Sequence, residues 1–287
     1  MSRAAKLRYV LAGVRHKVSR SVAICPSCSS RQSHVVAAKH LVTELHRCLD
    51  CQLLYRSPVT PVSVGPRFYD QDYSQGFTTE LPDDRRLNEL QAVGFRGTEK
   101  DYSSYIAVLQ ALGVGPGARV FDYGCSWGYG TWQLRQSGFV TDAFEISARR
   151  AQYARQKLGL DVVWELPPPR AVYDVFFSAH VLEHVSSVAE AVTYGLACLR
   201  SGGLFVAFTP NGSEPRRRAD GWRWDRAWGM VHPNFLDDVY YRSTWRKRPS
   251  CLASDPYELG LLQAWTESRD RHVTGDLSGA ELMFVCA

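Results

Sequence analysis

The stretch Asp122-Tyr123-Gly124-Cys125-Ser126-Trp127-Gly128-Tyr129-Gly130 ends a short apolar run, Arg119–Tyr123 (RVFDY), and leads into a predicted helix. Glycines that directly follow a strand and open a helix let the backbone turn sharply and approach a ligand, because no Cβ is in the way. The dinucleotide-binding spacing G-x-G-x-x-G is absent, since Ser126 occupies the middle position. The loop predicts a nucleoside-type ligand, and the alternative is a tight strand–helix turn that binds none.

A carboxylate follows the loop at the end of a second predicted strand. Residues Thr141–Glu145 (TDAFE) form that strand, and a helix is predicted over Ala148–Leu158. Glu145 stands about 20 residues past the loop, where an acid can accept both hydroxyl hydrogens of a ribose. The alternative is a surface acid at a helix start, where the helix dipole favours negative charge.

Strands and helices alternate along the rest of the main domain. A capping box at Ser187–Glu190 opens a helix with one apolar face. The other predicted strands are Asp161–Glu165, Tyr173–Ala179, Leu204–Phe208 and Gly279–Ala287. This alternation predicts the α/β class, with a doubly wound and mostly parallel sheet.

Four side chains with acid–base chemistry come after the predicted strand Tyr173–Ala179. His180, Glu183 and His184 stand at i, i+3 and i+4, and they share one face if that turn is helical. His232 comes later in the chain, among aromatic residues. Because an imidazole titrates near neutral pH, His184 or His232 is a candidate general base. The alternative is a segment that only lines a ligand pocket.

Two cysteine pairs precede the main domain: Cys25-Pro-Ser-Cys28 and, after nineteen residues, Cys48-Leu-Asp-Cys51. This spacing is typical of a tetrahedral four-thiolate zinc site. Because cysteines fill all four positions, the ion has no open position for chemistry and would be structural. So short a segment cannot bury enough core to fold alone, and the metal would supply the folding energy. The alternatives are a motif without metal and a labile disulfide.

Length and composition fit one large domain with a small appendage. The chain has 287 residues, a net charge of +5 and eight cysteines. The four cysteines outside the pairs are scattered through apolar contexts, which favours a reducing cytoplasm over a secreted disulfide framework. The sequence has no apolar run of about 18 residues that would predict a membrane-spanning helix. Residues Met1–Ser21 lack the features of a secretory signal.

The N-terminal arm is basic. Glu44 is the first acidic residue, and eight lysines and arginines precede it. Apolar residues recur among them at helix-like intervals, which predicts a basic amphipathic helix. Such a helix would contact an anionic membrane surface or a nucleic acid. The alternative is a solvated or frayed terminus.

Taken together, these residues resemble the class I S-adenosylmethionine-dependent methyltransferases. The resemblance rests on Asp122–Gly130, Glu145, Val181–Val185 (VLEHV) and the helix-to-strand turn Leu199–Gly203. Two further stretches, Cys48–Pro58 (CLDCQLLYRSP) and His232–Phe235 (HPNF), resemble methyltransferases that carry a C-x2-C…C-x2-C module. The resemblance therefore covers roughly residues 23–287.

This resemblance implies a seven-stranded Rossmann-like methyltransferase sheet with the strand order 3-2-1-4-5-7-6, its last strand antiparallel, preceded by a zinc-ribbon-like module. It also implies S-adenosyl-L-methionine as the cofactor. Asp122, Gly124 and Gly128 would hold the methionine end, and Glu145 would hold the ribose. The other expected cofactor contacts are Cys125, Ala179 and His180.

Two positions depart from the family pattern. Ser126 replaces a usual glycine, which a serine backbone tolerates if its φ stays negative. The stretch Trp164–Pro167 offers no clear aspartate for the adenine amino group.

The resemblance also bears on the acceptor. Many methyltransferases with this module act on sugars or glycan-building intermediates, and O-methylation is favoured because the chain is too short for the extra domain of sugar C-methyltransferases. Some metal-dependent O-methyltransferases carry a Glu-x-x-Glu-His version of His180–His184. A second divalent ion at His180, Glu183, His184 and His232 is therefore an alternative to a metal-free site. Arg216–Trp228 (RRRADGWRWDRAW) is predicted to face the acceptor, unless its tryptophans belong to the core.

Three rival functions stay open. The first is an RNA methyltransferase that uses the cysteine module and the basic arm to bind nucleic acid. The second is a zinc peptidase, because His180-x-x-Glu183-His184 matches the inverted protease motif. The third is a non-catalytic cofactor-binding module. The predicted organisation is a basic arm over 1–22, a zinc module over 23–58, a helical connector over 59–100 and a methyltransferase domain over 101–287.

Overall fold

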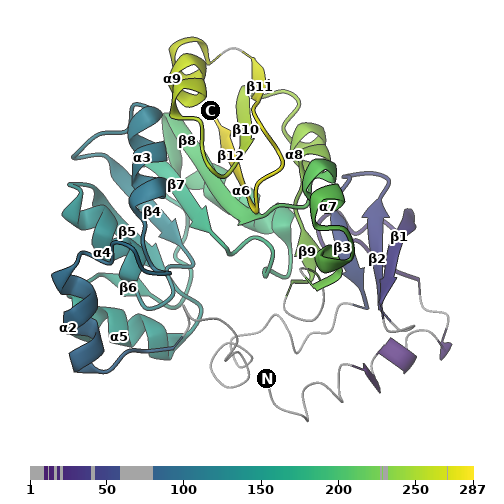
Figure 1. The fold of residues 1–287 in the computed structure, drawn as a ribbon, viewed down its shortest axis with the longest axis horizontal. Helices are drawn as coiled ribbons and strands as arrows, with labels where there is room; N and C mark the ends of the chain where they lie inside the picture. Colours follow the sequence, from purple (N-terminus) through teal and green to yellow (C-terminus); the bar gives the residue numbers. More distant parts are fainter. Residues whose placement is uncertain are drawn as a thin grey trace.

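The computed structural model describes residues 10–11, 13–15, 18–19, 22–39, 43–58, 80–226, 228, 232–269 and 271–287. These residues form one large mixed sheet and one smaller sheet, with helices packed around the large sheet (Figure 1). The predicted basic arm and the first half of the predicted connector, residues 59–79, lie mostly outside the described residues.

The large sheet contains eight strands. They are β4 (Arg119–Tyr123), β5 (Val140–Phe144), β6 (Val162–Val163), β7 (Tyr173–Ala179), β8 (Leu199–Pro210), β10 (Ser250–Ser254), β11 (His272–Thr274) and β12 (Glu281–Cys286). Their order across the sheet is β11-β10-β12-β8-β7-β4-β5-β6. The five strands from β8 to β6 are parallel, and β12 runs antiparallel between β8 and β10.

This sheet has the predicted α/β, Rossmann-like arrangement, but the predicted number of seven strands was wrong. The additional strand is β11, which is three residues long and pairs in parallel with β10 at the edge of the sheet. So short a strand has no alternation of apolar and polar residues to detect. The strand predicted over Asp161–Glu165 also shortens to the two residues of β6.

Helices cover both faces of the large sheet. The main ones are α2 (Asp84–Ala92), α3 (Ser103–Ala111), α4 (Tyr129–Gln136), α5 (Ala148–Leu158), α6 (Val188–Cys198), α7 (Glu214–Asp220), α8 (Asp238–Thr244) and α9 (Leu259–Ser268). Within the described part of the chain, none of the helices has the length and apolar character needed to cross a membrane.

Neighbouring residues of one strand pack in the cores on opposite faces of the sheet, because successive side chains point to opposite sides. In β4, Phe121 lies in the core that α6 and α8 cover. Its neighbour Val120 lies in the core that α3 and α9 cover. The strand ends that carry the candidate site are therefore held from both sides.

Local capping signals fix the helices that follow β5 and β7. The side chain of Ser147 accepts a hydrogen bond from the N–H of Arg150 at the start of α5, which ends at Gly159 with a φ of 64°. The hydroxyl of Ser187 accepts from the N–H of Glu190 at 3.2 Å, so Ser187 is the N-cap of α6, which is one of the two bonds of the predicted capping box. Such caps favour a defined helix start and stop.

The smaller sheet joins the N-terminal module to the main domain. It has the order β1-β2-β3-β9 and consists of β1 (Ser33–Lys39), β2 (Thr43–Cys48), β3 (Leu54–Ser57) and β9 (Asn234–Phe235). β3 and β9 pair antiparallel and lie side by side in Figure 1. The strands of the predicted module over 23–58 are thus completed by a strand from the main domain.

Candidate functional site

The glycine turn between β4 and α4 has a backbone that requires glycine. Gly124 and Gly128 have φ values of 88° and 87°, in the left-handed region where a Cβ causes strain. A Cβ on Gly128 would also lie 2.7 Å from the side chain of Leu160. The N–H groups of Gly124 and Cys125 donate to the carbonyl of Phe144 at 2.8 and 3.0 Å. These bonds tie the turn to the end of β5.

Ser126 does not meet the condition of a negative φ under which serine would readily replace the glycine. Its φ is 53°, a conformation that costs a residue with a Cβ about 1–2 kcal/mol. Its N–H donates to Oε2 of Glu145 at 2.9 Å, and this bond helps to hold the strained backbone. The Ser126 hydroxyl is buried and has no hydrogen-bond partner among the described residues.

Glu145 follows β5 directly and lies against the glycine turn. The residue is 4% exposed. Its Oε1 accepts from the N–H of Ser147 at 2.9 Å, and Nη1 of Arg150 lies 3.8 Å from the same oxygen. The turn and this carboxylate therefore meet at the adjacent ends of β4 and β5, which is the arrangement that a shared nucleoside ligand requires.

Asp122 lies in β4 immediately before the turn and is 2% exposed. The hydroxyl of Thr131 in α4 donates to its Oδ2 at 2.6 Å. Burial raises the pKa of Asp122, the bond from Thr131 opposes this shift and the charge of Glu145 adds to it, with a result of about 7. The thiol of Cys125 is also buried, and burial raises its pKa.

His180 follows Ala179 at the end of β7 and lies between two carboxylates. Its Nε2 donates to Oε2 of Glu281 in a short contact, and its Nδ1 lies 3.4 Å from Oε1 of Glu183. Burial lowers the pKa of His180, but the two carboxylates outweigh burial and raise it above the usual value. A histidine that retains its proton is a poor base, so the geometry disfavours His180 in that role.

Glu281, at the start of β12, was not identified from the sequence. It also accepts hydrogen bonds from the hydroxyls of Tyr105, at 2.6 Å, and Tyr257. The only signal in the sequence was an acid at the beginning of the last predicted strand. The two residues meet because β12 runs antiparallel to β8. The start of β12 therefore lies at the edge of the sheet where β7 and β8 end.

Glu183, His184 and His232 come together in space. Their possible ligand atoms all lie within 4.8 Å of one another. Glu183 is 1% exposed, and neither of its carboxylate oxygens has a hydrogen-bond partner among the described residues. Nε2 of His184 lies 3.7 Å from Oε1 of Glu183, and the ring centroids of the two histidines are 4.7 Å apart.

The surroundings of the Glu183 carboxyl favour its anionic form. Burial raises its pKa, but His180 and the charges of His184 and His232 outweigh burial and lower it to about 2. A buried anion between two imidazoles can stabilise an imidazolium that forms during proton transfer, or it can bind a cation.

The residues from His180 to His184 form a turn that is not helical, so the condition under which the three side chains would share a helical face is not met. The N–H of His184 bonds to the carbonyl of Val181 at 2.9 Å, and the next helix, α6, begins only at Val188. A zinc-peptidase motif of this kind presents its histidines from a helix. The structure therefore does not support the peptidase alternative.

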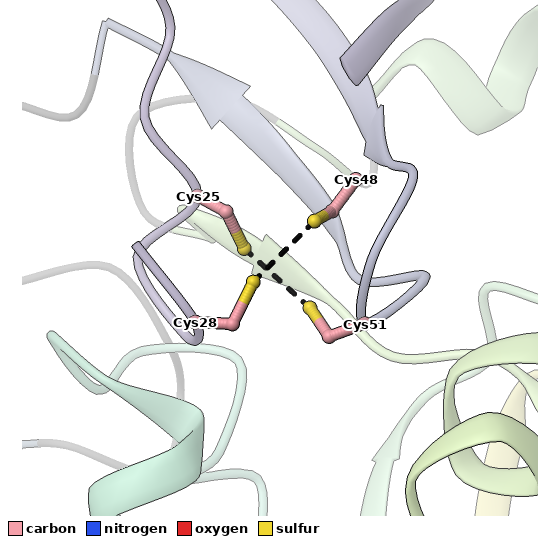
Figure 2. A group of neighbouring side chains, drawn as sticks. All are labelled: Cys25, Cys28, Cys48 and Cys51. Carbon is pink, nitrogen blue, oxygen red and sulfur yellow. Dashed lines mark hydrogen bonds between the residues drawn. The ribbon is translucent and has the colours of Figure 1, made fainter. Parts of the chain in front are cut away.

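The four cysteines of the module point their sulfurs at one centre (Figure 2). The Sγ–Sγ distances are 3.6 Å for Cys25 and Cys51 and 3.5 Å for Cys28 and Cys48. A tetrahedral zinc site with Zn–S bonds of about 2.3 Å has sulfurs about 3.8 Å apart, so the cluster fits zinc with small shifts.

The tryptophans of the stretch Arg216–Trp228 do not face an acceptor. Trp224 and Trp228 are 6% and 1% exposed and pack in the core between the small sheet and the main domain. Their neighbours there are Leu45, Leu54 and Phe235. The prediction of an acceptor-side surface was wrong for these two side chains, because β9 brings the module sheet over them.

Known proteins resemble this chain in its main domain. A family model described as a methyltransferase domain matches residues 96–248, which include the glycine turn, Glu145, Glu183, His184 and His232. The chain is 34% identical over 100 residues to a protein of Mycolicibacterium smegmatis described as a probable S-adenosylmethionine-dependent methyltransferase. That match covers 33% of this chain and 39% of the relative.

Two further relatives are described by different acceptors. The chain is 34% identical over 107 residues to a tRNA U34 carboxymethyltransferase of Geobacter sp., and the matched region covers 32% of each protein. It is 27% identical over 120 residues to a malonyl-[acyl-carrier protein] O-methyltransferase of Serratia marcescens, which covers 39% of this chain and 47% of that one. The chain thus spans less than half the length of each of these relatives.

Proposed function

The chain belongs to the methyltransferase-domain family and is an S-adenosylmethionine-dependent methyltransferase, and from this premise we propose that it methylates a hydroxyl oxygen of a sugar or another small-molecule intermediate. One observation carries the choice of an oxygen acceptor. The buried Glu183 carboxylate, without a hydrogen-bond partner in the described chain, lies beside His184 and His232. A hydroxyl is a weak nucleophile until its proton is removed, so an oxygen acceptor needs such a site.

The cofactor is proposed to bind at the ends of β4 and β5. When bound, S-adenosylmethionine supplies a methyl group on a positively charged sulfur. Asp122, Gly124 and Gly128 would hold its methionine end and Glu145 its ribose. The pocket would be lined further by Cys125, Ala179 and His180. The bond from Ser126 orients the Glu145 carboxylate, and an ionised carboxylate has lone pairs to spare for two ribose hydroxyls.

Proton removal is proposed to use the imidazole of His184 or His232. The acceptor oxygen attacks the methyl carbon in line with the breaking carbon–sulfur bond, and its proton passes to that imidazole. The anionic Glu183 stabilises the imidazolium that results. His180 is excluded from this step because Glu281 and Glu183 keep it protonated.

The same three side chains support a second mode, in which they hold a divalent ion that binds the acceptor oxygen and lowers its pKa. Two imidazoles and one carboxylate suit a borderline metal. His180 is not part of this set, since its Nε2 is bonded to Glu281. Titration calorimetry of the zinc-loaded protein with Mn2+ distinguishes the modes. Binding that Glu183→Gln abolishes supports the ion, and no binding to the wild type supports the metal-free base.

The four-cysteine cluster is proposed to hold a structural zinc ion. Its support is the fit of the sulfur distances to a tetrahedral site and the absence of disulfides among the eight cysteines, all of which lie in the described ranges. Free thiols in this number also suit the cytoplasmic location that we propose. Metal analysis should find one zinc per chain, lost in Cys28→Ser.

An RNA acceptor is the second candidate, favoured by the 34% identity to a tRNA-modifying relative. Against it, the arginines of α7 have partners within the chain: Arg216 pairs with Asp220, Arg218 pairs with Glu214, and Arg217 stacks over Trp224. If RNA is the acceptor, binding of a tRNA pool should be tight at physiological salt and fall steeply as salt rises. Absence of such binding removes this candidate.

The test of the main proposal uses transfer of labelled methyl groups to a panel of nucleotide-linked sugars. At least one of the variants His184→Ala and His232→Ala should lower the transfer rate by about 10²–10⁴-fold, which is the usual contribution of a general base. Calorimetry should find their S-adenosylmethionine affinity nearly unchanged. His34→Ala is the control, because His34 is exposed on β1 of the module.

The variants also show how the proposal fails. If both histidine variants transfer methyl groups at the wild-type rate, the acceptor does not need its proton removed here. A nitrogen or carbon acceptor would then replace the hydroxyl.

A further inference from the structure

A strand of the cysteine module holds the segment that carries His232. In the small sheet, Tyr55 of β3 is paired with Asn234 of β9. The N–H of Arg56 donates to the carbonyl of Pro233 at 2.8 Å, directly after His232. The backbone that follows His232 is therefore held in part by the module sheet, whereas Glu183 and His184 follow a strand of the large sheet.

Asn234 connects the two parts of the candidate site. It is fully buried, and its Nδ2 donates to the carbonyls of Leu182 at 3.3 Å and Val185 at 2.7 Å. Its backbone N–H donates to the carbonyl of Glu183 at 3.2 Å. Asn234 thus forms hydrogen bonds with three backbone carbonyls of the turn that carries Glu183 and His184.

A buried ion pair ties the second cysteine knuckle to the same segment. Arg47, which precedes Cys48, donates through Nη1 and Nη2 to the two carboxylate oxygens of Asp237 at 3.0 and 2.5 Å. Nη1 also donates to the carbonyl of Gln52, just after the knuckle, at 2.6 Å. Asp237 in turn caps α8 by accepting from the N–H of Tyr240. Such a bidentate pair has one favoured geometry.

The cysteines also share an apolar core with this segment. Cys25 and Cys48 are 1% and 0% exposed, and they belong to the same core as Leu236 and Tyr240. A close-packed core transmits displacement, because it has no free volume to absorb it. The specific links between the cysteine module and residues 232–240 are the Arg47–Asp237 pair and the β3–β9 strand pair, because the shared core also contains Tyr123 and Phe144 beside the cofactor turn.

We propose that the four-cysteine module is a positioning element of the catalytic site. With its sulfurs gathered on a metal, the module holds His232 beside Glu183 and His184, and when the metal is removed His232 leaves that position. Asn234 and Arg47 are positioning residues in this device. The role of His232 in the reaction rests on the proposed function, whereas the coupling between the cysteines and the imidazole pair is a separate statement about geometry.

The first experiment observes the imidazole pair directly in the full-length protein. With histidines isotopically labelled and zinc bound, NMR should detect a nuclear Overhauser contact between the rings of His184 and His232, whose centroids are 4.7 Å apart. Removal of zinc by a chelator should abolish this contact. Calorimetry on the same samples should find the S-adenosylmethionine affinity within about twofold, because the glycine turn and Glu145 lie on the large sheet.

A variant pair covers the case in which the metal-free protein does not fold. Asn234→Ala, with zinc bound, should lose the ring contact and lower kcat by about 10²-fold without raising the KM for the cofactor. The matched control is Asn211→Ala, since Asn211 is 2% exposed and its Nδ2 also donates to two backbone carbonyls, those of Leu277 and Gly279. It should cost similar stability and keep the ring contact.

The outcomes separate this inference from the proposed function. A ring contact that persists in the folded protein without zinc overturns the coupling, as does one that persists in Asn234→Ala or an equal loss of the contact in Asn211→Ala. Loss of the contact with unchanged methyl transfer leaves the coupling supported and overturns the role of His232 in proton removal.

Discussion

At the scale of single residues, the cofactor turn is built at the expense of stability. Ser126 holds a left-handed backbone, and Asp122 is a carboxyl group that burial brings to a pKa of about 7. Neither helps the chain to fold, yet both lie where the turn meets Glu145. Such local costs are usual at sites that must be formed before the ligand arrives.

The pKa of Asp122 predicts how its substitution changes stability with pH. Because its pKa is raised from 3.8 to about 7, the folded protein binds a proton that the unfolded chain releases in this range. The wild type therefore loses free energy of unfolding as the pH rises from about 4 to 7. Asp122→Asn, which stays neutral, should become more stable relative to the wild type over the same range.

Urea unfolding of both proteins at several pH values measures this difference. In Asp122→Asn the new amide oxygen can still accept the hydrogen bond from Thr131, so the comparison isolates the charge. A stability difference that does not change between about pH 4 and pH 8 would mean that the Asp122 carboxyl is not protonated in the folded protein.

The sequence predicts individual site residues well where the backbone itself demands a residue type. Gly124 and Gly128 stand at positive φ, and glycines at this spacing indicate the turn. The sequence groups His180 with Glu183 and His184 because it lies close to both in the chain. Its partner Glu281 is 101 residues away in sequence, and no local pattern reports a contact of that kind.

At the scale of elements, the strands and helices next to the site follow local signals. The bounds of β4, β7 and α5 agree with the predicted Arg119–Tyr123, Tyr173–Ala179 and Ala148–Leu158. A glycine turn and the serine caps mark these ends in the sequence itself. By contrast, the sequence did not predict β9, β10 and β11. Each has only two to five residues, and these form a strand because they pair with a neighbouring strand.

The cap of α6 gives a prediction at this scale. Ser187→Ala removes the hydroxyl that accepts from the N–H of Glu190, and loss of an N-cap of this kind costs about 1 kcal/mol of the free energy of unfolding. Urea unfolding should show this loss, with the affinity for S-adenosylmethionine unchanged. The neighbouring exposed Ser186→Ala is the control, and an equal loss in both variants would contradict the capping role.

At the scale of the whole molecule, the cysteine module and the main domain form one unit. The sequence predicted the module from its cysteine spacing, and the four sulfurs lie together. It did not predict that β9 completes the module sheet or that Trp224 and Trp228 fill the core between the two parts. These contacts join residues about 180 positions apart in the chain, a separation that no periodicity reports.

The cofactor half and the acceptor half of the proposed site are therefore held by different sheets. The cofactor half, with the glycine turn and Glu145, lies at the ends of neighbouring parallel strands of the large sheet. The acceptor half, with His232, depends on the module sheet.

The most direct measurement is titration calorimetry of S-adenosylmethionine with the wild type, Glu145→Ala and Glu145→Gln. Glu190→Ala is the control, because Glu190 is also an acid at a helix start but lies in α6. We expect both Glu145 variants to bind at least about tenfold more weakly, a loss of about 1.4 kcal/mol, and the control to bind as the wild type does. Unchanged affinity in the Glu145 variants would contradict the assignment of the glycine turn and this carboxylate to one cofactor molecule.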